Sequence, residues 1–310
     1  MTALAAAEAA WHYRLINACI AAGHIRREGP ATEPASLKDD VPGYYAMGLK
    51  GAPVCFLRGD RDINAGFLGQ TKDDYLIMAF RGTITSKESS DPAAICQDWT
   101  QSRLYDPTPW PPSGPATYGN TCQGFSAALA SLWNDIEAAL MHIDLARKQG
   151  IWITGHSKGG AMAALAATLF QSRITQARWL PKVVTFGAPM VGDEVFLQRY
   201  TEVGLMEKTK RYINQFDGVA AAPAVPTPPM PIPDCDGVQG WVSARPDYHP
   251  LGEDRYISRD LIDRYTIEVG GDADKHYRES VTAALINMNL VGPAHNPINN
   301  YLNCFRLADA

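Results

Sequence analysis

The chain has 310 residues, of which 46% are hydrophobic and 20% charged, and it carries a net charge of -5 at neutral pH. This length and apolar content are enough for one large core, so we expect a single domain over residues 1–310. The acidic balance, with no basic cluster longer than Arg26–Arg27, argues against a nucleic-acid partner. No apolar run is long enough to predict a transmembrane segment.

The first residues, Met1 to Ala5, lack the basic start of a signal peptide, and Glu8 interrupts the apolar stretch. We therefore expect a secreted protein if a leader has been removed, and a cytoplasmic one otherwise. The six cysteines lack the Cys-x-x-Cys spacing of a zinc or redox site. Aspartates at 39–40, 73–74 and 272–274 lack calcium-loop spacing, so the sequence predicts no metal and no cofactor.

Helix and strand patterns alternate along the chain. Helices are predicted over 5–22, 125–147, 194–203 and 274–290, and strands over 54–57, 65–68, 75–80, 183–186 and 211–216. The strand at 75–80 is continuously apolar, which is typical of a strand buried on both faces. Alternation of this kind implies right-handed crossovers, so the expected fold class is α/β, with a mostly parallel central sheet and helices on both faces.

The sequence Gly155-His156-Ser157-Lys158-Gly159 follows the apolar run Ile151–Ile153 and precedes a small-residue helix pattern. A serine at a sharp strand-to-helix turn has its hydroxyl exposed, and small neighbours two residues away avoid a clash. We interpret this pentapeptide as a nucleophile elbow. The alternative is an ordinary glycine-rich turn.

A serine nucleophile needs a histidine base and an acid that orients the histidine. Asp217 is the best candidate acid, because it follows the strand at 211–216, although Asp-Gly is also a common turn dipeptide. His249, His276 and His295 all lie downstream, in the order expected for the base. We favour His295, which is predicted to lie on a loop, while His249 and His276 stay open as alternatives.

The negative charge of a tetrahedral intermediate requires preorganised donors. One is expected to be the backbone N–H of Lys158, directly after the nucleophile. Thr83, which follows Phe80-Arg81-Gly82 at the end of a buried strand, offers a second N–H and a hydroxyl. The alternative for this tetrapeptide is a simple turn that ends the strand.

Six segments together resemble the class 3 lipases, the fungal-type triacylglycerol lipases of the α/β-hydrolase fold. They are Ala79–Thr83, Gln123–Phe125, Ile153–Gly160, Val184–Gly192, Arg211–Asn214 leading to Asp217, and Ala294–His295. The resemblance covers roughly residues 75 to 304. It implies that Ser157, Asp217 and His295 form a catalytic triad, that Thr83 and Lys158 form the oxyanion hole, and that His249 is structural. It also implies a Cys19–Cys304 disulfide as a hypothesis.

The chain departs from the family in its loops. The resemblance places a lid at about 84–120, and this region is long here, with Trp99, Tyr105 and Trp110 expected either to shield an acyl groove or to narrow the site. The proline-rich segment 219–233 is expected to form another wall, with Val225, Met230 and Ile232 facing substrate or a lipid interface.

The function that we expect is therefore ester hydrolysis by two-step acyl transfer, most directly that of a triacylglycerol lipase, with an ester or lipid as the substrate. A phospholipase, feruloyl esterase, thioesterase or polyester depolymerase would share the same residues and differ in its lid and groove. A non-catalytic binding protein with a vestigial site is the remaining alternative.

Overall fold

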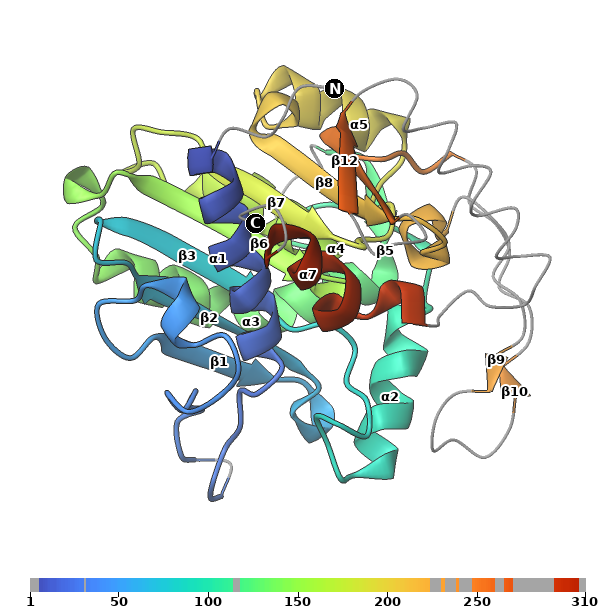
Figure 1. The fold of residues 1–310 in the computed structure, drawn as a ribbon, viewed down its shortest axis with the longest axis horizontal. Helices are drawn as coiled ribbons and strands as arrows, with labels where there is room; N and C mark the ends of the chain where they lie inside the picture. Colours follow the sequence, from blue (N-terminus) through green and yellow to red (C-terminus); the bar gives the residue numbers. More distant parts are fainter. Residues whose placement is uncertain are drawn as a thin grey trace.

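The computed structural model describes residues 6–30, 32–113, 118–223, 230–231, 238–239, 247–259, 265–269 and 293–306. These form a central eight-stranded sheet with the order β1-β2-β3-β6-β7-β8-β11-β12 (Figure 1). The strands of this sheet are β1 (Val54–Arg58), β2 (Asn64–Gln70), β3 (Tyr75–Phe80), β6 (Gly150–His156), β7 (Lys182–Phe186), β8 (Thr209–Asn214), β11 (Glu253–Arg259) and β12 (Tyr265–Val269).

Neighbouring strands from β3 to β11 pair in parallel, whereas β1, β2 and β12 pair antiparallel at the two edges. The antiparallel strands β1, β2 and β3 are joined by short connections, and the crossovers from β3 to β6 and from β6 to β7 contain helices. The sheet is therefore mostly parallel, as the sequence predicts, and its parallel strands all end at the same edge. Side chains on loops at that edge can converge on one site.

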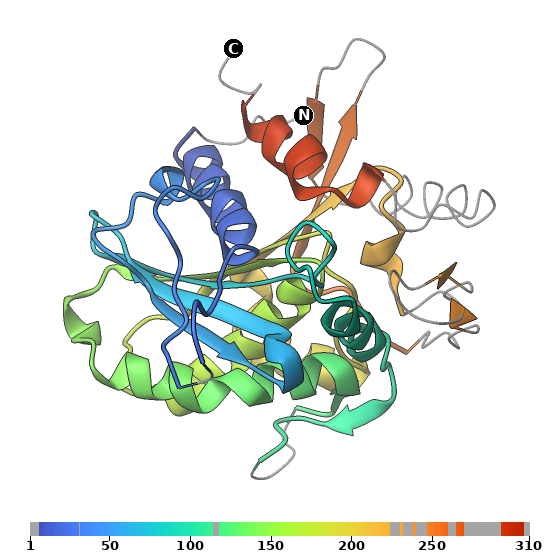
Figure 2. The same ribbon diagram turned by 90° about the horizontal axis from the view of Figure 1, so that it is seen from below.

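Helices cover both faces of the sheet (Figures 1 and 2). One face is covered by α1 (Ala6–Ala22), the π-helical segment Pro297–Leu302 and α7 (Asn303–Arg306), and the other by α3 (Gln123–Met141) and α4 (Lys158–Arg173). Successive β3 residues point into the two resulting cores, with Ile77 packed on the α1 side and Met78 on the α4 side. The remaining described helices are α2 (Pro92–Ser102) and α5 (Glu194–Glu202).

The predicted elements within the described residues all occur in the structure, with differences at their ends. The helix predicted over 125–147 ends at Met141, and a separate 3-10 turn covers Leu145–Arg147. The strand predicted over 211–216 ends at Asn214, because Phe216 adopts a positive φ of 66°, which an extended strand cannot contain. The predicted helix at 274–290 lies outside the described residues.

Aromatic side chains in the second half of the expected lid region pack into the core. Strands β4 (Pro107–Pro109) and β5 (Asn120–Cys122) form an antiparallel pair, and the Trp110 side chain beside them is fully buried. Its indole Nε1–H donates to Thr168 Oγ1 on α4 at 2.8 Å, and Tyr105 belongs to the same core. The expectation that Tyr105 and Trp110 shield an acyl groove or narrow the site is therefore wrong, because both side chains are buried in the core of the fold.

The hypothesis of a Cys19–Cys304 disulfide is also wrong. Both thiols are free and buried, and each has its own polar neighbour: Cys19 Sγ lies 3.3 Å from Thr154 Oγ1, and Cys304 Sγ–H donates to the Tyr301 carbonyl. Burial raises the pKa of Cys19 to about 12, so this thiol is unreactive at neutral pH. A different cysteine, Cys96 on α2, is disulfide-bonded.

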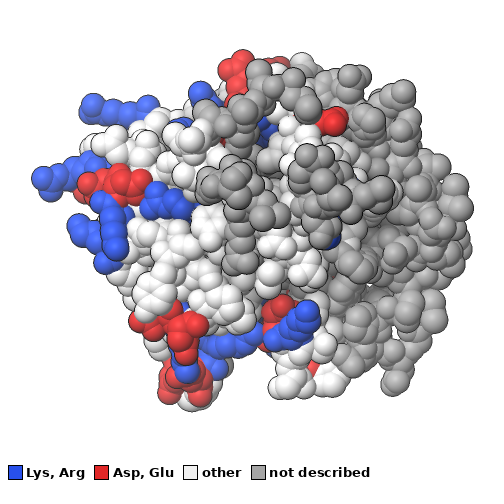
Figure 3. Space-filling model, in the orientation of Figure 1, with Lys and Arg blue, Asp and Glu red and all other residues white. Residues whose placement is uncertain are grey.

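No helix in the described part of the chain is both long and apolar enough to cross a membrane. The same residues contain no cluster of histidine, cysteine or carboxylate side chains that could hold a metal ion. On the face shown in Figure 3, charged side chains gather along the left edge and at the lower end, and the described middle of the face is largely uncharged.

Candidate active site

Ser157 lies between β6 and α4, at the edge where the parallel strands end. Its backbone has φ 57° and ψ -130°, a combination that costs a non-glycine residue free energy and is held by a hydrogen bond from the Ser157 N–H to the Phe186 carbonyl at 3.0 Å. The turn is so tight that a Cβ at Gly155 would lie 2.0 Å from the Gly159 carbonyl oxygen. The flanking glycines are therefore required sterically, as the nucleophile-elbow interpretation predicts.

Two backbone N–H groups are available beside this serine. Lys158 is the first residue of the 16-residue helix α4, so its N–H has no carbonyl one turn earlier, and the helix dipole favours negative charge at this end. Thr83 borders the same cavity as Ser157, and its N–H has no acceptor among the described residues. The Thr83 hydroxyl lies 2.9 Å from Ser102 Oγ on α2, which orients it.

Asp217 and His295 are brought together from two loops. His295 Nδ1–H donates to the Asp217 carboxylate, with both oxygens 2.9 Å away, and the Asp217 side chain is fully buried. His295 Nε2 is buried and has no hydrogen-bond partner in the described part of the chain. Both His295 and Ser157 line one cavity, so the free nitrogen of the imidazole is available to a group bound there.

Tyr301 completes the surroundings of Asp217 and was not found by sequence reasoning. Its hydroxyl donates to Asp217 Oδ2 and accepts the Asn214 N–H at 3.0 Å, while Asp217 Oδ1 accepts the Val219 N–H at 3.1 Å. Gly187 packs against this cluster with a φ of 55°, and a Cβ there would lie 2.7 Å from Asp217 Oδ2. No local pattern around Tyr301 points to this role, since it depends on the C-terminal segment returning to β8.

His156, inside the elbow motif, holds the main chain of His295. Its Nε2–H donates to the His295 carbonyl at 2.8 Å, and the two imidazole rings lie 4.5 Å apart between centroids. Burial holds the pKa of His156 well below 6.5, and repulsion from His295 lowers it further. His156 is therefore neutral at physiological pH and does not compete with His295 for a proton.

The Lys158 side chain makes a buried ion pair that sequence reasoning also missed. Its ammonium contacts the Asp98 carboxylate and also donates to the Ile63 carbonyl and Asn64 Oδ1, each at 3.3 Å. The other Asp98 oxygen accepts the Ile84 N–H at 2.9 Å. Asp98 therefore connects the two segments that carry the candidate oxyanion donors, because Ile84 follows Thr83 and Lys158 follows Ser157.

A cavity of about 420 Å³ opens above Ser157. Its apolar wall includes Ile20, Trp99, Pro297 and Ile298, of which Trp99 is one of the residues predicted to bind substrate. The Trp99 indole N–H donates to the Ile84 carbonyl at 3.0 Å, which keeps the ring beside the oxyanion loop. Of the other two predicted substrate-binding residues, Val225 lies outside the described residues. Met230 begins the short strand β9 (Met230–Pro231).

His249, one of the two alternative candidates for the base, is not among the described residues that line this cavity. His249 Nε2 lies 3.0 Å from a Glu194 carboxylate oxygen, and the His249 backbone N–H donates to the Gly192 carbonyl. These contacts fit the structural role that the resemblance implies. His276 lies outside the described residues.

Comparisons with known proteins show similarity to lipases. Residues 77–227 match the model of the family described as Lipase (class 3). A lipase of Caenorhabditis elegans is 28% identical over 151 residues, which cover 46% of this chain and 39% of that protein. The secreted mono- and diacylglycerol lipase 3 of Gibberella zeae is 28% identical over 104 residues, which cover 33% of this chain and 32% of the relative.

These alignments therefore span less than half the length of either curated relative. The solved structure of the triacylglyceride lipase of Rhizomucor miehei is similar over 96% of this chain and 98% of its own, with a TM-score of 0.63 and 16% identity. This similarity establishes the α/β-hydrolase fold. The match over residues 77–227 relates this part of the chain to the class 3 lipase family.

Proposed function

We propose that this protein hydrolyses carboxylic esters by serine acyl transfer, with Ser157 as nucleophile, His295 as base and Asp217 as the orienting acid. The observation that carries the proposal is the His295–Asp217 hydrogen bond at 2.9 Å, with the other imidazole nitrogen unpartnered in the cavity that Ser157 lines. In the absence of substrate, the hydrogen bond between nucleophile and base is often long or unformed.

The reaction has two steps. His295 Nε2 takes the Ser157 proton as the serine oxygen attacks the ester carbonyl, and Asp217 stabilises the imidazolium that results. The N–H groups of Lys158 and Thr83 donate to the oxyanion. Collapse of the tetrahedral intermediate breaks the ester C–O bond, and the alcohol leaves with the proton from His295. Water then attacks the acyl-enzyme in the same way and releases the acid.

We infer that the acyl chain lies against Ile20, Trp99 and Ile298, the apolar part of the cavity wall. A triacylglycerol or a related neutral glyceride is the substrate class that this wall and the family relationship support best. The lid expected at 84–120 stays a proposal, and we narrow it to residues 85–91. The ion pair of Asp98 with Lys158 anchors α2, and Tyr105, Trp110 and Tyr118 pack in the core.

We also propose that the protein works in an oxidising, secreted environment. The disulfide at Cys96 supports this, because such bonds are rare where thiols are kept reduced, and one of the matched relatives is named as secreted. Thiol titration of protein isolated from its native source, with and without reductant, tests it. Full reactivity of Cys96 without reductant would contradict the proposal.

The test of the proposed function is ester turnover by wild type and variants. We expect wild type to hydrolyse p-nitrophenyl butyrate and emulsified triglyceride, and a fluorophosphonate probe to label Ser157. Ser157→Ala and His295→Ala should lower kcat by several orders of magnitude. His249→Ala is the matched control, since its histidine bonds Glu194 instead.

The outcomes separate the alternatives. Activity of His295→Ala equal to wild type would overturn the base assignment. Absence of probe labelling in folded wild type would favour the binding-protein alternative. Turnover of soluble esters without turnover of emulsified triglyceride would assign the protein to another esterase class.

A further inference from the structure

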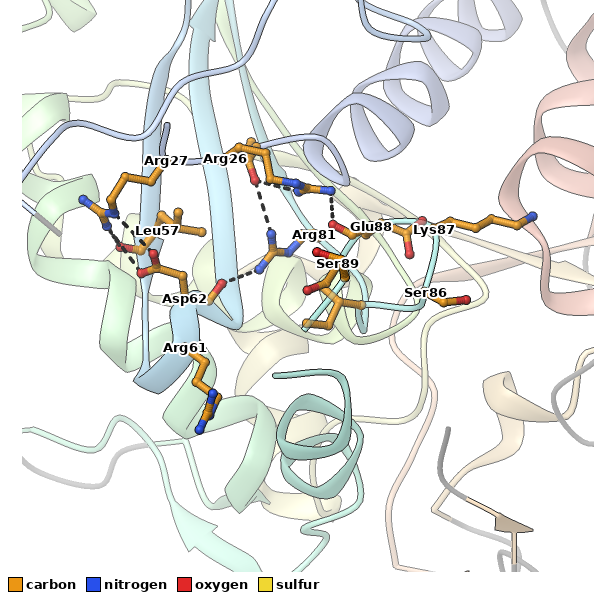
Figure 4. A pocket seen from close by; sticks show the side chains of 13 residues that line it. Arg26, Arg27, Leu57, Arg61, Asp62, Arg81, Ser86, Lys87, Glu88 and Ser89 are labelled. Atoms are coloured by element: carbon orange, nitrogen blue, oxygen red, sulfur yellow. Dashed lines mark hydrogen bonds and ion pairs between the residues drawn. The ribbon is translucent and has the colours of Figure 1, made fainter. Parts of the chain in front are cut away.

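A second cavity, of about 500 Å³, lies next to the Ser157 cavity and has an excess of positive charge in its wall (Figure 4). The wall contains five basic side chains and two acidic ones, namely Arg26, Arg27, Arg61, Arg81 and Lys87 against Asp62 and Glu88. The two cavities share part of their lining, including Arg81 and Lys87. A ligand in one is therefore close to a ligand in the other.

The acidic groups of this wall already have partners. The Asp62 carboxylate pairs with Arg27 at 3.2 Å. The Glu88 carboxylate accepts the Thr85 N–H at 2.9 Å as well as the Thr85 hydroxyl. Arg61 pairs with a carboxylate outside the wall, that of Asp91, at 3.0 Å. Neither acid of the wall forms an ion pair with the other two arginines, Arg26 and Arg81.

Arg26 and Arg81 are bonded to backbone carbonyls instead. Arg81 donates to the Asp62 carbonyl at 2.6 Å and to the Ile25 carbonyl at 3.4 Å, and Arg26 donates to the carbonyls of Gly23 and Ile25 at 2.8 Å and to that of Glu88 (Figure 4). Within the described part of the chain, no carboxylate forms an ion pair with either guanidinium.

Arg81 is the buried member of this pair. Only 5% of its surface is exposed, and its Nε–H has no hydrogen-bond partner among the described residues. Burial lowers the pKa of Arg81 to about 10; the charges of Asp98, Glu88 and Asp62 oppose this shift, and the nearby charge of Arg26 adds to it. A buried cation beside a second cation, with no carboxylate in direct ion-pair contact with either, favours the binding of an anion.

We propose that this cavity binds a phosphate group, as a monoester or a diester. Guanidinium N–H groups match the oxygens of a phosphate, and Arg26 and Arg81 have N–H groups to spare after their carbonyl bonds. Lys87 adds a third positive charge, and the hydroxyls of Ser86 and Ser89 supply donors to the remaining oxygens of a tetrahedral anion. A carboxylate has only two oxygens and would leave several of these donors unused.

The phosphate can come from two sources. One is free phosphate, which acts as a ligand of its own. The other is the headgroup of a phospholipid whose acyl ester reaches Ser157, a case that rests on the proposed function. The shared wall at Arg81 and Lys87 permits the second case, because it connects the two cavities directly.

The first experiment measures binding of inorganic phosphate to the wild-type protein by calorimetry in a low-chloride buffer. We expect saturable binding that weakens as salt is added, and at least about tenfold weaker binding by Arg26→Gln and by Lys87→Gln. Arg26→Lys, which keeps the charge, should recover part of the affinity. Arg147→Gln, at an exposed arginine outside the cavity wall, is the matched control and should bind like wild type.

Absence of saturable binding by wild type at millimolar phosphate overturns the proposal. So does equal binding by wild type, Lys87→Gln and Arg26→Gln, provided that the variants show wild-type circular dichroism. This assay needs no catalysis, so its result is independent of whether the protein hydrolyses esters.

The second experiment distinguishes the two sources. Turnover of a short-chain phosphatidylcholine is compared with that of a diacylglycerol with the same acyl chains. If the headgroup is the ligand, Arg26→Gln lowers the ratio of phospholipid to diacylglycerol turnover about tenfold. If free phosphate is the ligand, Arg26→Gln leaves the ratio of phospholipid to diacylglycerol turnover unchanged, although it still weakens phosphate binding in calorimetry. Turnover of p-nitrophenyl butyrate by the same preparations reports separately on the proposed esterase activity.

Discussion

The buried ion pair between Lys158 and Asp98 should couple the stability of the protein to its activity. The two side chains are 1% and 0% exposed, so neither charge is solvated by water. Lys158→Met leaves the Asp98 carboxylate with a neutral donor, the Ile84 N–H. Asp98→Asn leaves the Lys158 ammonium with two neutral acceptors at 3.3 Å. Each change strands one buried charge.

The expected magnitude follows from this burial. Removal of one partner from a buried pair costs about 3–5 kcal/mol, because the remaining charge is uncompensated. The double variant Lys158→Met/Asp98→Asn contains no stranded charge, so we expect it to lose no more stability than either single variant. The coupling free energy between the two sites should then be about 3 kcal/mol or more.

Activity should fall as well, since Asp98 bonds Ile84 beside Thr83 and pairs with Lys158 beside Ser157. If the pair holds the two oxyanion donors in place, its loss should lower kcat by about a hundredfold, the scale of one misplaced donor. KM should change much less, because the donors act on the transition state.

The assay is urea unfolding followed by tryptophan fluorescence, with p-nitrophenyl butyrate turnover on the same preparations. The control is the exposed pair Arg199–Glu202, joined at 3.1 Å and about half exposed on each side, for which Arg199→Met should cost less than about 1 kcal/mol. Additive single effects, or a Lys158→Met variant as stable as wild type, would refute this reasoning.

Three further changes test other parts of the structure. Tyr301→Phe removes the hydroxyl that donates to Asp217, so kcat should fall roughly tenfold to a hundredfold, with little change in KM; wild-type kcat would contradict this. Gly187→Ala should abolish turnover without unfolding the protein, as checked by circular dichroism, because its Cβ would meet the Asp217 carboxylate at 2.7 Å; an active variant would contradict the clash. Burial lowers the pKa of His12 to about 3, below its value of 6.5 in the unfolded chain, so the unfolded chain binds the proton first as pH falls. As pH falls from 6 to 4, His12 should therefore lower the free energy of unfolding by up to about 1.4 kcal/mol per pH unit. Urea titration at each pH measures this slope, which should be smaller in His12→Phe.

The sequence alone determined the order and kind of the elements around the site. The continuous apolar run of β3 favours a strand buried on both faces. The small residues after Ser157 favour a helix that packs closely on the sheet. Asp217 was predictable because strand β8 delivers it to the same edge as Ser157. These inferences depend on local patterns and on the geometry of parallel sheets, which sequence spacing reports directly.

Only the tertiary structure decided the contacts between distant segments. Tyr301 reaches Asp217, and Lys158 reaches Asp98, across 84 and 60 positions in the sequence. No periodicity encodes such partners, because each depends on how whole elements pack. The same reason explains the wrong expectations for Trp110 and for Cys19. The family resemblance suggested a lid residue and a disulfide, but both side chains are buried where the fold has apolar volume to fill.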